Sequence, residues 1–206
     1  MENFILKYNV SRETYHLLES YVALLCEWQK KFNLVSNNSL PFVWERHISD
    51  SAQLFKYISE DVKSIYDFGS GAGFPALVLA IIAKEKRPYI KFKLVESIGK
   101  KTLYLNAVKT ALNLDNVEIF NCRVESLKLA SADMITARAM TALDGLFEYS
   151  LPFCSKETKL VFPKGQSYEE ELNKAKQKWN FKLKVEKNEI SEDGVILLFE
   201  NLRRKK

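Results

Sequence analysis

Cysteine, histidine and glycine are scarce in this 206-residue chain, and each scarcity excludes a class of protein. The cysteines, Cys26, Cys122 and Cys154, are odd in number, widely spaced and without a CxxC pair, so we expect buried, reduced thiols and a cytoplasmic protein. Only His16 and His47 are present, with no HExxH motif and no Cys/His cluster, so no metal site is predicted. Seven glycines and five prolines are too few for a collagen or a low-complexity chain.

Long hydrophobic runs are also missing. The longest, residues 74–83, falls well short of the roughly 20 residues that a membrane-spanning helix needs. The first twenty residues include charged side chains and have no continuous apolar stretch, so neither a secretory signal nor a membrane partner is predicted. Hydrophobic residues still make up 47% of the chain, which is enough for the core of one α/β domain of this length.

The net charge of +5 is modest but unevenly placed. Between positions 84 and 109, eight basic residues against two acidic ones give +6, so the rest of the chain sums to about −1. The eight are Lys84, Lys86, Arg87, Lys91, Lys93, Lys100, Lys101 and Lys109. This stretch is where a polyanion such as a nucleic acid would bind, with a solvated charged face as the alternative.

The first sixty residues have the periodicity of helices. Apolar residues between Tyr15 and Phe32 recur at three-to-four spacing after Ser11, a plausible N-cap, and a polar break at 36–39 precedes a second helical stretch at 44–57. No linker divides the chain, so we expect one compact unit. In it, residues 1–60 form a helical cap packed on the core and residues 61–206 form the main domain.

Strand and helix patterns alternate from residue 61 onwards. Strands are predicted at 64–68, 90–95, 117–120, 134–137 and 159–162, with helices at 75–83, 100–112, 141–150 and 168–179. Such alternation predicts parallel strands with helices on both faces of one sheet. Two last strands, at 181–185 and 195–200, have only a polar turn between them and should pair antiparallel.

A glycine-rich turn follows the first strand, where a doubly wound sheet binds its ligand. Gly69, Gly71 and Gly73 alternate, which lets the backbone turn tightly and approach a ligand closely. The second strand ends at Glu96, whose carboxylate can accept hydrogen bonds from ribose hydroxyls. The glycine turn could be only a tight turn and Glu96 only a solvated charge. Found together at two neighbouring strand ends, they favour a site for a nucleoside cofactor.

Two further strand ends carry candidate cofactor contacts. After the third strand, Val124 and Glu125 could hydrogen-bond an adenine edge, although an ion pair between Arg123 and Glu125 is an equal alternative. The fourth strand ends at Arg138, an inward arginine that needs an anionic or carbonyl partner. The carboxylate of a cofactor and a structural salt bridge both satisfy that need.

The chain resembles the ribosomal RNA small subunit methyltransferase G family, also called glucose-inhibited division protein B. The pieces that carry the resemblance run in order over nearly the whole chain: Trp28 with Lys31-Phe32-Asn33-Leu34, Arg46-His47-Ile48 with Asp50-Ser51, Asp67 through Pro75, Glu96-Ser97 with Gly99-Lys100-Lys101, Arg138-Ala139 and Lys164-Gly165-Gln166. The resemblance implies a Rossmann-like class I S-adenosylmethionine-dependent methyltransferase, with a seven-stranded mostly parallel sheet and an N-terminal helical extension. It implies methylation of guanine N7 in the 530 loop of 16S ribosomal RNA, naked or in the small subunit.

Carried over by motif position, the resemblance places Gly69, Phe74, Val124, Glu125 and Arg138 in the S-adenosylmethionine pocket. Glu96 stands where the family more often has aspartate, Ala76 where it often has glycine, and Val124 where alanine is common. None of these departures removes a hydrogen-bond acceptor, so they concern the shape of the pocket.

The fourth strand end also bears on the reaction. Guanine N7 has an exposed lone pair, so direct in-line transfer needs no general base and no covalent intermediate. Cytosine C5 methylation needs a cysteine nucleophile and adenine N6 methylation an Asn/Asp-Pro-Pro-aromatic clamp, whereas this strand ends in Thr136-Ala137-Arg138. Candidate RNA contacts are Arg46, His47, Lys100, Lys101, Lys164 and residues 203–206.

Two other functions are compatible with the predicted fold. A nicotinamide-dependent oxidoreductase is disfavoured by the G-x-G-x-G spacing and by Val108 at the lysine position of a Tyr-x-x-x-Lys pair starting at Tyr104. A non-catalytic RNA-binding module is disfavoured by the intact cofactor positions. No apolar surface stripe suggests an oligomer, so we expect a monomer without an obligate protein partner.

Overall fold

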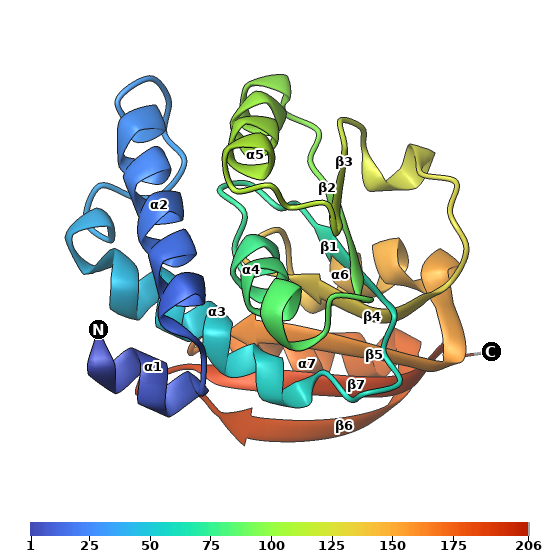
Figure 1. Ribbon diagram of the computed structural model, residues 1–206. Helices are drawn as coiled ribbons and strands as arrows, with labels where there is room; N and C mark the ends of the chain where they lie inside the picture. Colours follow the sequence, from blue (N-terminus) through green and yellow to red (C-terminus); the bar gives the residue numbers. More distant parts are fainter. Residues whose placement is uncertain (206) are drawn as a thin grey trace.

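The computed structural model describes residues 1–205 and has a seven-stranded sheet at its centre (Figure 1). The strand order is β3-β2-β1-β4-β5-β7-β6. The strands are β1 (Ser64–Phe68), β2 (Lys91–Val95), β3 (Val117–Phe120), β4 (Ala132–Ala137), β5 (Cys154–Lys164), β6 (Trp179–Lys187) and β7 (Val195–Arg204). The order reverses between β1 and β4, and this switch point is where such a sheet binds its ligand.

Strand directions confirm the predicted sheet. Strands β1 to β5 pair parallel, and β7 pairs antiparallel with both β5 and β6. Phe68 of β1 is level with Val95 of β2 and with Ala137 of β4. The residues that follow these three strands therefore emerge side by side at one edge of the sheet.

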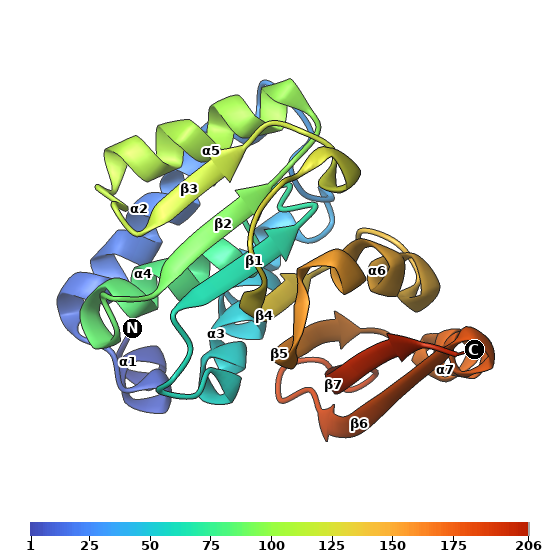
Figure 2. The same cartoon turned by 90° about the vertical axis from the view of Figure 1, so that its right-hand side faces the viewer.

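Helices cover both faces of the sheet (Figure 2). The longer ones are α1 (Glu2–Tyr8), α2 (Arg12–Gln29), α4 (Ala76–Lys86), α5 (Gly99–Ala111), α6 (Leu143–Ser150) and α7 (Tyr168–Lys178). Side chains alternate along β1, so Ile65 joins the core under α2, α4 and α5, whereas Tyr66 and Phe68 join the core under α6 and α7. The chain thus builds two apolar layers, one on each face.

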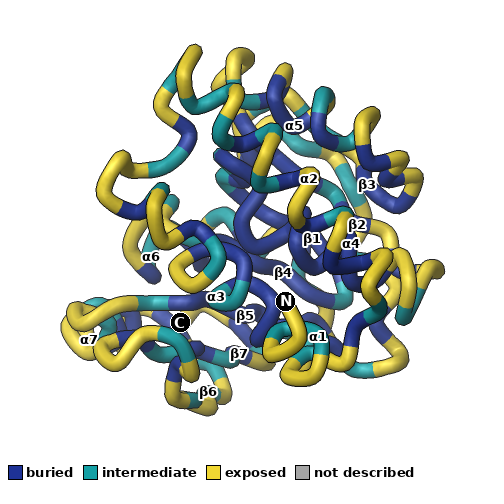
Figure 3. The backbone as a smooth tube through the Cα atoms, turned by 60° about the vertical axis from the view of Figure 1, so that its left-hand side comes forward, coloured by how far each residue is buried: buried dark blue, intermediate teal, exposed yellow. Residues whose placement is uncertain are grey.

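Helix α4 is the most deeply buried element. All residues from Ala76 to Ala83 are buried, because α2 covers the side of α4 that faces away from the sheet (Figure 3). Tyr21 and Leu25 of α2 are completely buried in this contact. The N-terminal helices therefore pack on the sheet domain rather than standing apart from it.

Several predicted elements differ from the structure. Helix α1 was not anticipated, and the expected helix at 44–57 is broken into a π-helical turn η2 (Trp44–Ser49), a short α3 (Asp50–Ala52) and a 3-10 turn η3 (Gln53–Tyr57). The wide π turn changes the helical phase, so the apolar spacing alone misjudged this segment. The cysteines are unpaired, as expected, but each is only partly buried. No helix within residues 1–205 is long and apolar enough to cross a bilayer.

The predicted basic stretch is divided between two ends of the sheet. Helix α4 runs back from the ligand edge, so Lys84 and Lys86 at its end cap the carbonyls of Asn113 and Tyr8 at the opposite edge. Of the eight basic residues, only Lys100 and Lys101, in the first turn of α5, lie near the ligand edge. The eight residues therefore do not form one continuous face for a polyanion.

Candidate active site

The glycine turn adopts the backbone conformations that its composition predicts. Gly69, Gly71 and Gly73 have φ angles of 66°, 54° and 93°, in the left-handed region that favours glycine. The turn is tied to the next strand, since the N–H groups of Gly69 and Ser70 donate to the carbonyl of Val95 at 2.9 and 3.1 Å. A Cβ on Gly71 would meet only a backbone oxygen at 3.7 Å, so this glycine leaves room for a ligand.

Helix α2 supports the turn from behind. The Tyr21 hydroxyl donates to the carbonyl of Ala72 at 2.5 Å. A Cβ on Gly73 would lie 2.4 Å from a methyl carbon of Leu77 and 2.8 Å from the Tyr21 hydroxyl. Gly73 is therefore required for packing, whereas Gly71 is positioned for ligand contact.

Two buried carboxylates lie beside the turn. Glu96 is 5% exposed, and its two oxygens accept from the N–H groups of Gly71 at 2.9 Å and Ile98 at 2.8 Å. Each oxygen has a second lone pair, so Glu96 can still accept hydroxyl donors. Asp67 Oδ1 accepts from Thr136 at 2.7 Å, but Oδ2 has no partner among residues 1–205. Burial raises the pKa of Asp67 to about 7.

The residues after β3 form a 3-10 turn, η4 (Val124–Ser126). Val124 is buried and packs in the core layer that also contains Phe68 and Val95, while Glu125 is exposed. The first N–H groups of a helical turn have no partner within that turn, so η4 presents backbone donors beside the glycine turn.

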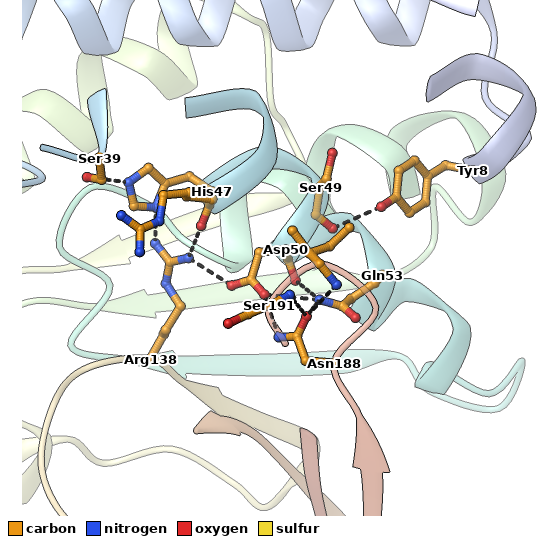
Figure 4. Close-up of polar contacts among 11 residues, drawn as sticks. Tyr8, Ser39, His47, Ser49, Asp50, Gln53, Arg138, Asn188 and Ser191 are labelled. Atoms are coloured by element: carbon orange, nitrogen blue, oxygen red, sulfur yellow. Dashed lines mark hydrogen bonds and ion pairs between the residues drawn. The ribbon is translucent and has the colours of Figure 1, made fainter. Parts of the chain in front are cut away.

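Arg138 is held by three groups of the N-terminal segment (Figure 4). It donates to the carbonyl of Arg46 at 3.3 Å, to Asp50 Oδ2 at 3.2 Å and to Nδ1 of His47 at 2.7 Å, and it lies 5.0 Å from the ring centre of Phe74. These bonds use three of the five N–H donors of the guanidinium, which leaves two for a ligand.

His47 is buried at 9% exposure, so it is not the open RNA contact that we anticipated. Its ring stacks on Phe74 with the centroids 4.8 Å apart, and its Nε2 lies 2.9 Å from the Ser39 hydroxyl. Burial and then the neighbouring Arg138 and Arg46 lower the pKa of His47 to about 4. A neutral ring that accepts from Arg138 at Nδ1 must carry its proton on Nε2 and donate to Ser39.

A cleft of about 840 Å³ opens beside Arg138. Its walls come from the N-terminal segment, the ends of β4 and β5 and the β6–β7 hairpin, and they include Phe42, Arg46, Asp50, Met140, Lys164 and Asn188. Met140 also touches the glycine turn, since a Cβ on Gly69 would lie 2.9 Å from its Cγ. The flexible Met140 side chain thus separates the glycine turn from the cleft.

Of the predicted RNA contacts at 203–206, Arg203 and Arg204 end β7 at the edge opposite the ligand edge, and Lys206 lies outside the described residues. The remaining predicted contacts fall into two groups. Arg46, Lys100 and Lys101 are exposed or partly exposed at the ligand edge. Lys164 is only 12% exposed and donates to the carbonyl of Thr141 at 2.9 Å and to Glu171 at 2.8 Å. Its ammonium therefore positions the loop after β4, in addition to lining the cleft.

Three further residues, Asp50, Asp67 and Asn188, contribute to the site without a role predicted for them, although Asp50 belongs to a piece that carries the family resemblance. Asp67 was read only as part of the glycine motif, although an acidic residue that ends a buried strand is itself a signal. Asp50 and Asn188 are 138 positions apart and hydrogen-bonded at 2.7 Å. No local sequence pattern predicts a contact between residues so far apart in the chain.

The chain matches the family model for rRNA small subunit methyltransferase G over residues 14–194. It belongs to this family. It is 38% identical to a ribosomal RNA small subunit methyltransferase G of Bartonella henselae over 95% of this chain and 90% of the relative. It is 40% identical to that of Jannaschia sp. over 92% of this chain and 90% of the relative. Family membership makes the protein an S-adenosylmethionine-dependent methyltransferase.

Solved structures support the fold. A SAM-dependent methyltransferase from Aquifex aeolicus aligns with a TM-score of 0.59 at 16% identity, covering 77% of this chain and 92% of that one. An O-methyltransferase from Bacillus cereus in complex with SAH aligns with a TM-score of 0.56 at 13% identity, covering 88% and 91%. Both likenesses show the class I methyltransferase fold predicted from the sequence.

The residues present fit S-adenosylmethionine. The unpartnered Oδ2 of buried Asp67 can accept from an ammonium group, and the open side of Gly71 accommodates a close ligand. Glu96 suits ribose hydroxyls and the two remaining donors of Arg138 suit a carboxylate. No cluster of potential metal ligands occurs in the described part of the chain.

Proposed function

We propose that this protein methylates N7 of a guanine in the 530 loop of 16S ribosomal RNA. The observation that carries the proposal is the family match over residues 14–194, which covers every element of the site. A ribosomal RNA substrate implies a cytoplasmic enzyme, and we expect it to act as a monomer. The bound S-adenosylmethionine supplies an electrophilic methyl group on a sulfonium.

The chain's own residues bind and orient the reactants. We assign Gly69, Gly71, Phe74 and Glu96, with Val124, Glu125 and Arg138, to the cofactor, and the adjoining cleft to the guanine. Gly73, predicted as a cofactor contact, instead serves the packing of the turn. Two cleft carboxylates, Asp50 and Glu171, are ion-paired with Arg138 and Lys164 at 3.2 and 2.8 Å. Each carboxylate thus already has a cationic partner, and a ring nitrogen that loses no proton needs no general base from this cleft.

Phe42 supplies an apolar surface at this cleft. Its side chain is 54% exposed although it is large and hydrophobic, and it lies close to the cations Arg46 and Lys164 among the lining residues. Unpaired RNA bases stack on aromatic side chains in this kind of setting. We assign Phe42 to a base of the RNA loop, with Arg46, Lys100 and Lys101 on its phosphates.

Methyl transfer from labelled S-adenosylmethionine tests the proposal. The acceptors are small subunits and naked 16S RNA from a strain without this protein, with fully methylated wild-type subunits as the control. We expect label to enter only RNA from the deficient strain. Absence of transfer to either acceptor, with cofactor binding intact, would point to the non-catalytic RNA-binding module.

A further inference from the structure

The tip of the β6–β7 hairpin is built into the site by Asn188. This side chain is only 4% exposed. Its Oδ1 accepts from the N–H groups of Ile190 and Ser191 at 2.8 and 2.9 Å, which shapes the hairpin, and its Nδ2 donates to Asp50 Oδ1 at 2.7 Å. Its Oδ1 also accepts from Nε2 of Gln53 at 2.9 Å, and the N–H of Glu189 donates to Gln53 at 3.0 Å, so the hairpin is joined to the N-terminal segment at both Asp50 and Gln53 (Figure 4).

Asp50 passes this constraint to Arg138. Its Oδ1 receives Asn188 and also Gln53 at 3.0 Å, so only Oδ2 faces the Arg138 guanidinium at 3.2 Å. The side chains of Asp50 and Arg138 are 14% and 18% exposed. An ion pair at the wall of the cleft with this little exposure is only partly screened, so a small turn of the carboxylate changes its interaction with Arg138.

We propose that Asn188 is a positioning residue for the methyltransferase site. Through Asp50 it sets the direction in which Arg138 presents its two remaining N–H donors. The inference rests on the proposed role of Arg138 in binding the cofactor. If so, the C-terminal hairpin contributes to the same cofactor pocket as the glycine turn, which lies more than one hundred residues earlier in the chain.

The two functions of Asn188 can be separated by one substitution. Asn188→Asp keeps an oxygen for the N–H groups of Ile190 and Ser191 but places a second carboxylate oxygen where Nδ2 donated to Asp50. Two carboxylates at that distance do not both remain ionised, so one pKa of the pair rises. Protonation then restores a donor, now O–H, between the two side chains.

This variant should therefore be defective at high pH and repaired at lower pH. The charged and titratable groups that surround Asp50 are Tyr8, Arg46, His47, Lys56, Arg138 and Glu189. Tyr8, whose pKa burial raises to about 12, and His47, with a pKa of about 4, do not titrate between pH 6.0 and 8.5. Asp67, with a pKa of about 7, titrates in both proteins, so the ratio of variant to wild-type affinity at each pH reports the new carboxyl pair.

The experiment is a calorimetric titration of S-adenosylmethionine into wild type, Asn188→Asp and a control, Glu189→Gln, at pH 8.5 and 6.0. Glu189 is the next hairpin residue and pairs with Lys7 and Lys56 instead of Asp50. Loss of a charge-assisted hydrogen bond predicts that Asn188→Asp binds about 10-fold to 100-fold more weakly at pH 8.5. We expect the loss to shrink below about 3-fold at pH 6.0, and the control to stay within about 2-fold of wild type throughout.

Unchanged affinity of Asn188→Asp at pH 8.5 would overturn the inference, as would a loss that persists at pH 6.0 or an equal loss in Glu189→Gln. If Asn188→Asp does not fold, the double variant Asp50→Asn with Asn188→Asp decides, because it restores the hydrogen bond with the donor reversed. We expect it to bind more weakly than wild type by the same factor at both pH values, whereas wild-type affinity would contradict the inference. Failure of the proposed function appears separately, as cofactor binding without methyl transfer to guanine N7.

Discussion

Arg138 donates a hydrogen bond to Nδ1 of His47 across 2.7 Å, and so links the end of β4 to the N-terminal helical segment. An arginine is always protonated, so His47 can accept this bond only in its neutral form. The same histidine stacks on Phe74 of the glycine turn and lies 2.9 Å from the Ser39 hydroxyl. The N-terminal segment therefore packs directly against the glycine turn and the end of β4.

The neutral state of His47 predicts an acid limit to stability. Its pKa is about 4 in the folded protein and near 6.5 in the unfolded chain, so the unfolded state binds more protons between these values. The contribution of His47 to the free energy of unfolding should therefore fall as the pH drops from 6.5 to 4. In His47→Gln this part of the decline should disappear. Urea denaturation at pH 4.5, 5.5, 6.5 and 7.5 checks this, and parallel curves for the two proteins would contradict it.

Asp67 predicts proton release when the cofactor binds. Its pKa is about 7 because the carboxylate is buried, and a cationic ligand beside Oδ2 would lower that pKa. At pH 6 we expect binding to release up to one proton, measured by calorimetry in buffers of different ionisation enthalpy. Asp67→Asn should bind without this release and at least about 10-fold more weakly. Equal release by both proteins would assign the proton elsewhere.

Without ligand, Asp67 should make the protein less stable as the pH rises, which is the opposite of the pH dependence due to His47. The folded state binds more protons than the unfolded state between pH 3.8 and 7, because the folded pKa is the higher one. Burial of this carboxyl therefore costs stability as the pH rises through that window. Without ligand, Asp67→Asn should melt at a higher temperature than wild type at pH 8, and a lower melting temperature would contradict this assignment.

The glycines of the turn predict separable effects. Gly71→Ala and Gly73→Ala both place a Cβ on a residue with positive φ, but only at Gly73 does the new atom meet Leu77 at 2.4 Å. Gly73→Ala should lose about 1–3 kcal/mol more stability than Gly71→Ala because of this overpacking. Gly71→Ala should instead lose mainly cofactor affinity. Urea denaturation and calorimetry of both variants test the distinction.

The ligand edge was predictable from sequence, whereas its enclosure was not. A parallel sheet aligns its strand ends, so the glycine turn, Glu96 and Arg138 could be brought together from the strand pattern alone. Asp50 and Asn188 meet only because the hairpin docks on the N-terminal segment, and the π turn at 44–49 hides the burial of His47 from helical spacing. Lys84 and Lys86 belong to the same basic stretch as Lys100 and Lys101 but lie at the opposite edge, because α4 runs away from the ligand edge.

Replacement of Phe42 should weaken RNA binding through lost base stacking but leave the stability of the protein unchanged. The side chain is 54% exposed, so Phe42→Ala should leave the melting temperature within about 2 °C of wild type. Loss of one stacked base should raise KM for RNA about 5-fold to 100-fold. Phe42→Trp should retain wild-type KM, whereas Phe42→Leu should resemble the alanine variant. Equal KM for the leucine and tryptophan variants would show that the ring does not stack.

Lys100 and Lys101 predict the salt dependence of RNA binding. If each contacts a phosphate of single-stranded RNA, Lys100→Ala with Lys101→Ala should lower the slope of log affinity against log salt by about 1.4. Lys63→Ala with Lys91→Ala is the matched control, since Lys63 precedes β1, Lys91 begins β2 and both are exposed at the opposite edge. Filter binding at several salt concentrations measures both slopes. An equal change in the two double variants would mean that overall charge, and not this edge, binds RNA.

The atom that receives the methyl group tests the central claim most directly. After incubation of small subunits from a deficient strain with enzyme and S-adenosylmethionine, borohydride reduction and aniline cleavage reveal each N7-methylguanine as a break in the 16S RNA. We expect one new break, in the 530 loop, that is absent without cofactor. A methyl group on another atom, or a break outside that loop, would contradict it.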